Sequence, residues 1–153
     1  PAVVIGAGGA ARAVCVALQD AGAPEIRVVN RTVEKAEGLA MDLGRPVTVY
    51  EWEDRHDVLR EGAFLVNTTS LGMTGMAPLE LDLAGLPATA SVCDIVYAPL
   101  ETPLLSAARA RGNQTIDGLG MLLHQARPGF EAWFGQVPDV TSSLRQAVLS
   151  AME

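Results

Sequence analysis

The sequence predicts an α/β fold, a doubly wound and mostly parallel sheet of six strands with helices on both faces. Short apolar runs alternate along the chain with segments whose apolar residues recur at helical spacing. Such alternation is typical of parallel sheets built from strand–helix–strand units. In addition, a glycine-rich segment at residues 6–11 directly follows the first apolar run and opens the first helical pattern. Open α/β sheets bind their ligands at loops of this kind.

Length and composition indicate a single globular domain. The 153 residues are 49% hydrophobic and 19% charged, which is enough apolar material for one core. The net charge of −7 argues against a nucleic-acid partner, whose phosphates require clustered Lys and Arg. No apolar run approaches the roughly 20 residues of a membrane span. We therefore expect one domain over residues 1–153, with neither a nucleic-acid nor a membrane partner.

Six short runs of apolar and β-branched residues are expected to form the strands. In chain order they are Ala2–Ile5, Ile26–Val29, Val47–Tyr50, Phe64–Asn67, Ser91–Ile95 and Gln114–Ile116. Residues 71–90 lie between the fourth and fifth strands and are rich in Gly, Pro and Met. This composition predicts a long functional loop with an extended stretch.

Apolar residues three and four positions apart predict two helices in the first half of the chain. The first begins near Ala10 and ends at Gly22, and the second ends at Gly44. Glycine is the usual residue after the last turn of a helix, because it adopts the left-handed conformation without strain. The polar stretch 54–61 is expected to form one or two helical turns.

Three further helices are expected in the second half. The Thr-Pro pair at 102–103 predicts an N-cap followed by proline in the first turn, and Arg-Gly at 111–112 closes that helix. An apolar stripe over 119–134 predicts the next helix, with a kink or break at 128–129 because proline lacks the N–H that a helix interior requires. The last helix is predicted at about residues 142–152.

Cys15 and Cys93 are the two cysteines, and each lies alone in an apolar segment. They form neither a Cys-x-x-Cys pair nor a spacing typical of metal ligands. We interpret them as small buried thiols, which suits the reducing cytoplasm. No other cluster of His, Cys, Asp or Glu predicts a metal site.

The glycine loop predicts a dinucleotide cofactor and, with it, a Rossmann-like sheet. Residues 6–11 read Gly-Ala-Gly-Gly-Ala-Ala, which fits the pattern G-x-G-x-x-[GA] between a strand and a helix. Glycine allows the tight turn and lets the backbone approach a pyrophosphate, while the small Ala11 permits close packing of helix on strand. The N-terminus of the helix then attracts the anion. A purely structural tight turn is the alternative.

The end of the second strand favours NADP over NAD. An NAD site usually places Asp or Glu there to bind the adenosine ribose, but this chain has Asn30, which brings no charge to repel a 2′-phosphate. Arg31 can form charge-assisted hydrogen bonds with that phosphate. Thr32 is expected to cap the next helix, and Lys35 adds a second cation one turn later. Glu34 is a mild counter-signal, and the alternative is an exposed Arg and Lys beside an N-cap.

Five segments together resemble the C-terminal, NADP-binding domain of shikimate dehydrogenases. They are "VIGAGGAARA", "NRTVEKA", "VNTTSLGM", "DIVYAPLETPLL" and "DGLGMLLHQA". They follow the order and spacing of that family over nearly the whole chain. The glycine loop alone is unspecific, but its combination with the last two segments is highly specific. The resemblance implies reduction of 3-dehydroshikimate to shikimate with NADPH, in aromatic amino-acid biosynthesis.

The resemblance also implies roles for individual residues. Those implied to bind the cofactor are Gly6, Ala7, Gly8, Gly9, Ala10, Asn30, Arg31, Thr32, Lys35, Thr69, Ser70, Ile95, Gly118 and Met121. Tyr97 and Gln125 match positions that contact the substrate. Met121 as plain core, Tyr97 as a packing residue and Gln125 as a solvent-facing residue are the alternatives. His124, the neighbour of Gln125, is expected to turn away from the cleft and to take no part in catalysis.

The resemblance places the catalytic Lys and Asp in a substrate domain N-terminal to this one, so we expect no catalytic residue in this chain. The chain would be the cofactor half of the enzyme and would share its substrate with that domain. The last helix would pack back toward it. Three alternatives remain open: a quinate/shikimate dehydrogenase-like paralogue with another substrate, a glutamyl-tRNA-reductase-type domain, and a non-catalytic NADPH-sensing module.

Overall fold

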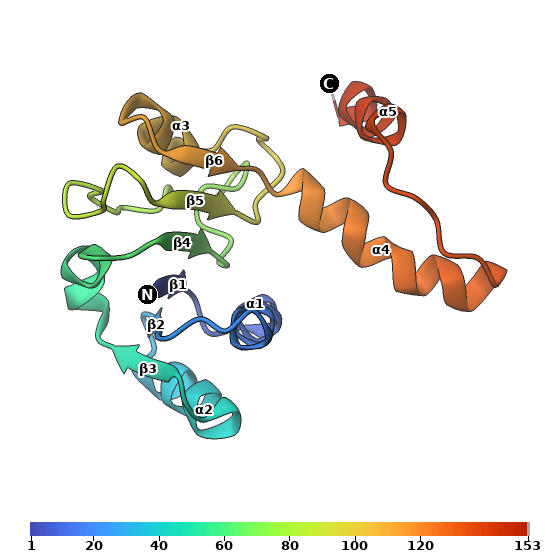
Figure 1. Cartoon of the computed structure of the whole chain (residues 1–153). Coiled ribbons are helices and arrows are strands. Elements are labelled where there is room, and N and C mark those ends of the chain that lie inside the picture. The colour runs from blue at the N-terminus through green and yellow to red at the C-terminus, as the bar shows by residue number, and fades with distance from the viewer. Residues whose placement is uncertain (153) are drawn as a thin grey trace.

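Six parallel strands form one twisted sheet at the centre of the molecule (Figure 1). The computed structural model describes residues 1–152. The strands are β1 (Ala2–Ile5), β2 (Ile26–Val29), β3 (Val47–Tyr50), β4 (Phe64–Asn67), β5 (Ser91–Asp94) and β6 (Gln114–Ile116). They lie in the order β3-β2-β1-β4-β5-β6, and all five pairings are parallel. The predicted fold class is therefore confirmed.

The strand order reverses between β1 and β4. From β1 the chain moves outward through β2 to β3, then returns to the other side of β1 and moves outward again through β5 to β6. The loops that leave β1 and β4 consequently diverge at the carboxyl edge of the sheet, with Ile5 beside Asn67. Open α/β sheets bind ligands in the crevice at such a switch point.

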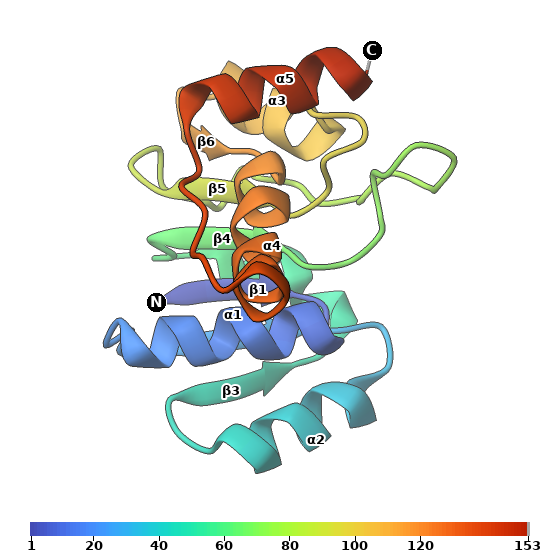
Figure 2. The same cartoon turned by 90° about the vertical axis from the view of Figure 1, so that its right-hand side faces the viewer.

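Helices cover both faces of the sheet (Figure 2). The helical elements are α1 (Gly9–Asp20), α2 (Val33–Leu43), the 3₁₀ helix η1 (Trp52–Leu59), α3 (Pro103–Ala110), α4 (Leu119–Phe134) and α5 (Ser142–Met152). On one face α1 and α2 pack through Cys15 and Leu39 against Val4 and Val28. On the other face η1, α3 and the loop 71–90 pack against Val3, Ile5 and their neighbours. No helix within residues 1–152 has both the length and the apolar character that crossing a membrane requires.

The last two helices differ from the rest because they leave the sheet. In Figure 1, α4 extends from the carboxyl end of β6 away from the body, and the chain then returns to α5 beyond β6. One ion pair fixes the return, since Arg145 of α5 lies 2.6 Å from the Asp117 carboxylate just before α4. Both helices carry exposed aromatic or aliphatic side chains, among them Trp133 and Phe134.

Most element bounds agree with the sequence-based expectation. Five of the six strands have the predicted bounds, and the fifth strand ends at Asp94, so Ile95 already belongs to the following loop. Thr102 caps α3, because its Oγ1 accepts a hydrogen bond from the Leu105 N–H over 3.3 Å. The loop 71–90 contains no helix or strand, as predicted, and residues 142–152 form α5.

Three expectations require correction. Of the kink or break expected at 128–129, the break is absent, because α4 is one continuous helix through Pro128. Pro128 lies on an exposed stretch, where water can hydrate the carbonyl that loses its partner. Thr32 stands at the N-cap of α2, but its side chain accepts no capping hydrogen bond. Cys15 is buried as expected, whereas Cys93 is only partly buried.

Candidate functional site

Gly6 begins the glycine loop in a conformation that the fold itself demands. Its φ is +114°, and a Cβ at this position would lie 2.6 Å from Thr68 Oγ1. That hydroxyl is fixed, because it donates a 2.7 Å hydrogen bond to the Ile5 carbonyl oxygen. The loop after β1 and the loop after β4 therefore pass each other at a distance that only glycine permits.

Gly8 and Gly9 are free of any such packing constraint. A Cβ on either residue would meet no heavy atom within 4 Å. Gly8 is the N-cap of α1, and no side chain caps this helix. The first hydrogen bond runs from Arg12 N to Gly8 O, so the N–H groups of the preceding turn have no intrahelical partner. Free N–H groups and the helix dipole make this end of α1 suitable for an anion.

A polar cavity of about 240 Å³ opens beside this loop, across the carboxyl ends of β1, β2 and β4. It is lined by Gly6, Ala7, Gly8, Asn30, Arg31, Trp52, Thr68, Thr69, Ser70 and Leu71. The structure thus brings together the glycine loop and the end of β2, as the sequence predicted. Trp52 is a lining residue that the sequence analysis missed.

Arg31 is the cation of this cavity. Its side chain is exposed and makes no hydrogen bond or ion pair with any of residues 1–152. Asn30 holds the turn beneath it by donating from Nδ2 to the Thr32 carbonyl oxygen over 2.8 Å. Thr32 and Lys35 are exposed at the start of α2 and do not line the cavity. The guanidinium is therefore available for a ligand phosphate.

A larger cavity of about 350 Å³ adjoins the first and shares its central wall, Thr68–Ser70. It is lined by Thr68, Thr69, Ser70, Met73, Ile95, Val96, Tyr97, Ala98 and Met121. These residues come from the loops after β4 and β5 and from α4. Besides Thr69 and Ser70, five predicted residues belong to this end of the site. Three of them, Ile95, Tyr97 and Met121, line the cavity, and the other two are Gly118 and Gln125.

Gly118 does not line the cavity, but it brings the start of α4 against the loop after β5. A Cβ on Gly118 would overlap the carbonyl oxygens of Ile95 and Val96. Only glycine therefore lets the start of α4 approach the loop after β5 this closely. Met121, three residues along, then lines the cavity. Gln125 follows one turn later on the same side of the helix, exposed and outside the cavity.

Thr69 contributes a methyl group and backbone rather than a free hydroxyl. Its Oγ1 donates to Asn67 Oδ1 over 2.7 Å and accepts from Leu71 N over 3.1 Å. The methyl carbon faces the glycine loop, 3.0 Å from where a Gly6 Cβ would stand. Both hydrogen bonds of the hydroxyl are therefore made within its own loop. Thr69 can contact a ligand through its methyl group and its backbone.

Asn67 and Asp94 are the most deeply buried polar residues behind these walls, and the sequence analysis assigned neither a role. Asn67 Nδ2 donates to Asp94 Oδ1 over 2.9 Å. Burial raises the pKa of the Asp94 carboxyl, and hydrogen bonds from Thr102, Val96 and Asn67 partly oppose that rise. Within residues 1–152 no group of His, Cys, Asp or Glu is arranged to hold a metal ion.

Two family models match the chain. Residues 1–74 match the model "Shikimate / quinate 5-dehydrogenase", and residues 118–149 match "Shikimate 5'-dehydrogenase C-terminal domain". A shikimate dehydrogenase (NADP(+)) of Paramagnetospirillum magneticum is 65% identical over 150 residues, which is 98% of this chain and 54% of that protein. One from Rhodospirillum rubrum is 60% identical over 153 residues, 97% of this chain and 54% of that protein. The chain spans about half the length of these relatives.

Solved structures have the same fold. Shikimate 5-dehydrogenase of Thermus thermophilus, in complex with NADP(H) and shikimate, superposes with a TM-score of 0.84 at 38% identity, covering 99% of this chain and 55% of that one. Quinate dehydrogenase of Corynebacterium glutamicum, in complex with NAD, superposes with a TM-score of 0.87 at 36% identity, covering 97% and 54%. Both likenesses extend over the sheet and the two projecting helices.

Proposed function

Because this chain belongs to the shikimate dehydrogenase family, we propose that it is the cofactor-binding half of an NADP-dependent shikimate dehydrogenase. The whole enzyme would reduce 3-dehydroshikimate to shikimate, in aromatic amino-acid biosynthesis. The observation that carries this proposal is the pair of adjoining cavities along the carboxyl edge of the sheet. One is polar and contains the glycine loop and a free guanidinium, and the other is mostly apolar. The pyrophosphate and 2′-phosphate of NADP require a polar, cationic site, and the flat nicotinamide ring requires an apolar one.

The polar cavity suits the adenosine and pyrophosphate half of NADP. The uncapped N-terminus of α1, with Gly6, Ala7, Gly8, Gly9 and Ala10, would hold the pyrophosphate. Arg31 would pair with the 2′-phosphate, with Asn30, Thr32 and Lys35 around it. Absence of a carboxylate at the end of β2 favours NADP over NAD. The quinate dehydrogenase neighbour has NAD in its complex, so the choice of cofactor is a point to be tested.

The larger cavity suits the nicotinamide. Thr69, Ser70 and Ile95 would form its walls, and Met121, set in place by Gly118, would close one side. When bound, NADPH supplies the hydride, and the protein's part is to orient it and to exclude water. Tyr97 is exposed at the rim, and Gln125 projects one turn beyond Met121. We assign to these two the substrate contacts on this side of the cleft.

The remaining half of the enzyme would supply the proton-transfer pair, Lys and Asp, and the other wall of the substrate site. We propose that residues 1–153 form the NADP-binding domain and that α5 packs toward the substrate domain. The exposed apolar side chains on α4 and α5 support this arrangement. The two free cysteines suit a reducing compartment, and we propose the cytoplasm.

The experiment compares residues 1–153 with the full-length gene product. Both should bind NADP, but only the full-length protein should form NADPH when shikimate is added, because a positioned acid–base pair contributes about 10²–10⁴-fold. In the full-length protein, Gln125→Ala should lower kcat/KM for shikimate and leave the NADP Kd unchanged. His124→Ala, on the neighbouring exposed position, is the control and should change neither. Turnover of quinate but not shikimate would assign the chain to the paralogue, and NADP binding without turnover of either would indicate a sensor.

A further inference from the structure

Asn67 and Asp94 occupy equivalent places on neighbouring strands. Each is the last residue of its strand, β4 or β5, and the two are partners in the parallel register. Both are completely buried. From each of them the chain enters a loop that lines the larger cavity, so these two positions are the points from which both walls start.

The Asn67 amide holds the first wall. Its Oδ1 accepts hydrogen bonds from Thr69 N over 3.0 Å and from Thr69 Oγ1 over 2.7 Å. Its Nδ2 donates to the Leu71 carbonyl oxygen over 3.0 Å and to Asp94 Oδ1 over 2.9 Å. Both amide hydrogens and both acceptor positions are used. The side chain therefore has no capacity left for a ligand.

The Asp94 carboxylate holds the second wall. Oδ1 accepts from Val96 N over 3.1 Å as well as from Asn67, and Oδ2 accepts from Thr102 Oγ1 over 2.7 Å. Thr102 in turn caps α3, so the loop 95–102 is attached to Asp94 near both ends. The same loop contacts the start of α4 at Gly118. Movement of this loop would consequently shift Met121 as well.

Three hydrogen bonds join the two walls. Two are backbone bonds, from Ile95 N to the Asn67 carbonyl oxygen over 3.1 Å and from Thr74 N to the Ala98 carbonyl oxygen over 2.8 Å. The third is the side-chain bond from Asn67 to Asp94. From this geometry we infer, building on the proposed function, that Asn67 and Asp94 are positioning residues for hydride transfer. Together with the two backbone bonds, these side chains fix the loops after β4 and β5 at one separation. They thereby fix the place of the nicotinamide relative to the substrate, without touching either. We call Asn67, Asp94 and the hydrogen bonds of their side chains the clamp. Loss of the clamp should lower the rate of the chemical step. It should leave nucleotide affinity nearly unchanged, because the glycine loop and Arg31 line the other cavity.

The expected fall in rate follows from the sensitivity of hydride transfer to the positions of the reacting groups. A misplacement of about 1 Å in a reacting pair can cost about 100-fold in rate. Asp94→Ala in the full-length enzyme removes all three acceptor bonds at once. We expect kcat to fall about 10- to 100-fold, the primary deuterium isotope effect to rise as hydride transfer becomes rate-limiting, and the NADP Kd to change by less than about threefold.

Asn113→Ala is the matched control. Asn113 is also a buried residue that pins a loop, since its Nδ2 donates to the carbonyl oxygens of Pro87, Ala88 and Ala90. That loop lines neither cavity. The control should lose thermal stability and keep kcat and the isotope effect. Asp94→Asn retains Oδ1, with its bonds from Asn67 and Val96, and should recover most of the activity that Asp94→Ala loses.

The emission of bound NADPH gives a second readout that does not depend on turnover. It reports the surroundings of the nicotinamide, and we expect it to change in Asp94→Ala but not in Asn113→Ala. Should Asp94→Ala fail to fold, Thr102→Val removes one bond of the clamp and should give smaller changes in the same direction. A clamp variant that loses only stability, like the control, would overturn the inference. A wild-type enzyme that binds NADPH without turning over shikimate would instead refute the proposed function, and NADPH emission would still test the clamp.

Discussion

At the scale of single residues, the packing of the protein requires glycine at one position of the glycine loop, Gly6, but not at another, Gly8. A side chain at Gly6 would collide with Thr68, whereas one at Gly8 would meet no protein atom within 4 Å. Gly8 also has a negative φ of −90°, which alanine can adopt. Neither packing nor backbone conformation therefore requires glycine at position 8. The close approach of a phosphate would require it.

We predict opposite effects for the two alanine substitutions. Gly6→Ala should destabilise the chain by about 1–3 kcal/mol, through overpacking and a positive φ. Gly8→Ala should leave the unfolding temperature unchanged and weaken NADP binding by about 1–3 kcal/mol, because hydrogen bonds to a charged group are lost. Thermal denaturation and NADP titration of both variants provide the test. Undiminished NADP affinity in Gly8→Ala would contradict the placement of the pyrophosphate.

Arg31 should determine the choice of cofactor. Arg31→Asp should weaken NADP binding by about 1–3 kcal/mol, because the charge-assisted pair with the 2′-phosphate is lost, and should affect NAD binding little. Arg60→Asp is the control: it changes the net charge equally, but Arg60 is exposed beside Asp57 and lines neither of the two cavities. Titration with both nucleotides measures the effect. Equal affinity of the unmutated chain for NADP and NAD would refute the assignment.

Burial of Asp94 predicts a specific pH dependence of stability. Because its pKa is raised in the folded chain, the folded state retains a proton that the unfolded state has already released near the ordinary value of 3.8. The contribution of Asp94 to the free energy of unfolding therefore decreases as pH rises from that value through the raised pKa, and is constant above it. Urea denaturation of wild type and Asp94→Asn across this range gives the difference. A wild-type contribution that increases with pH over this window would contradict the sign.

At the scale of elements, the sequence was sufficient to predict those features that local residue patterns determine. The strands alternate with amphipathic helices, and the bounds of the strands were predictable to within a residue. The clamp between Asn67 and Asp94 was not, because it arises from the neighbouring positions of β4 and β5, 27 residues apart. Trp52 was missed for a similar reason, since only the sheet order brings it to the glycine loop. The chain does not break at Pro128, because an exposed helix tolerates the loss of one hydrogen bond.

The start of α4 provides a test at this scale. Gly118→Ala should push α4 away from the carbonyl oxygens of Ile95 and Val96, at a cost of about 1–3 kcal/mol in stability, and displace Met121 from the cavity. Gly120→Ala, two residues along the same helix, would meet no atom within 4 Å and should stabilise the chain by about 0.4–1 kcal/mol. Thermal denaturation distinguishes the two. Equal effects would show that the close approach at Gly118 does not limit the position of α4.

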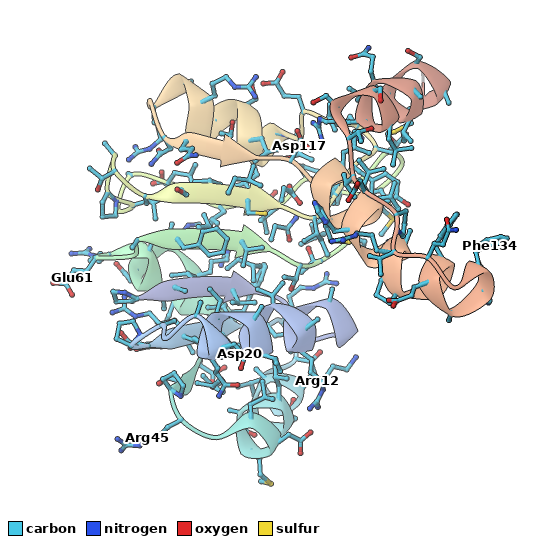
Figure 3. The ribbon with its side chains drawn as sticks, turned by 45° about the vertical axis from the view of Figure 1, so that its right-hand side comes forward. Arg12, Asp20, Arg45, Glu61, Asp117 and Phe134 are labelled. Atoms are coloured by element: carbon cyan, nitrogen blue, oxygen red, sulfur yellow. The ribbon has the colours of Figure 1, made fainter. Side chains whose placement is uncertain are left out.

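At the scale of the whole molecule, the sheet is covered on both faces. The two helices beyond it stand apart, with Phe134 near the far end of α4 (Figure 3), and they expose an apolar surface. The surface is a groove of about 520 Å³ between α4 and α5. Its lining includes Phe130, Trp133 and Phe134, and Trp133 is 81% exposed. Exposed apolar patches of this kind mark interaction sites, and we propose that the substrate domain covers this one.

We predict that charge introduced into this groove has opposite consequences in the two lengths of protein. Phe130→Glu with Trp133→Glu should make residues 1–153 more soluble and leave NADP binding intact, because neither residue lines the cofactor cavities. In the full-length enzyme the same pair should destabilise the protein and abolish turnover, since buried carboxylates without partners are costly. Met41→Glu is the control: Met41 is 85% exposed on α2, away from the groove, and its replacement should be neutral in both. Light scattering, NADP titration and the NADPH-absorbance assay report these effects. Full activity of the groove variant in the full-length enzyme would show that the groove does not carry the substrate domain, because a packed interface cannot accept two unpaired charges without loss.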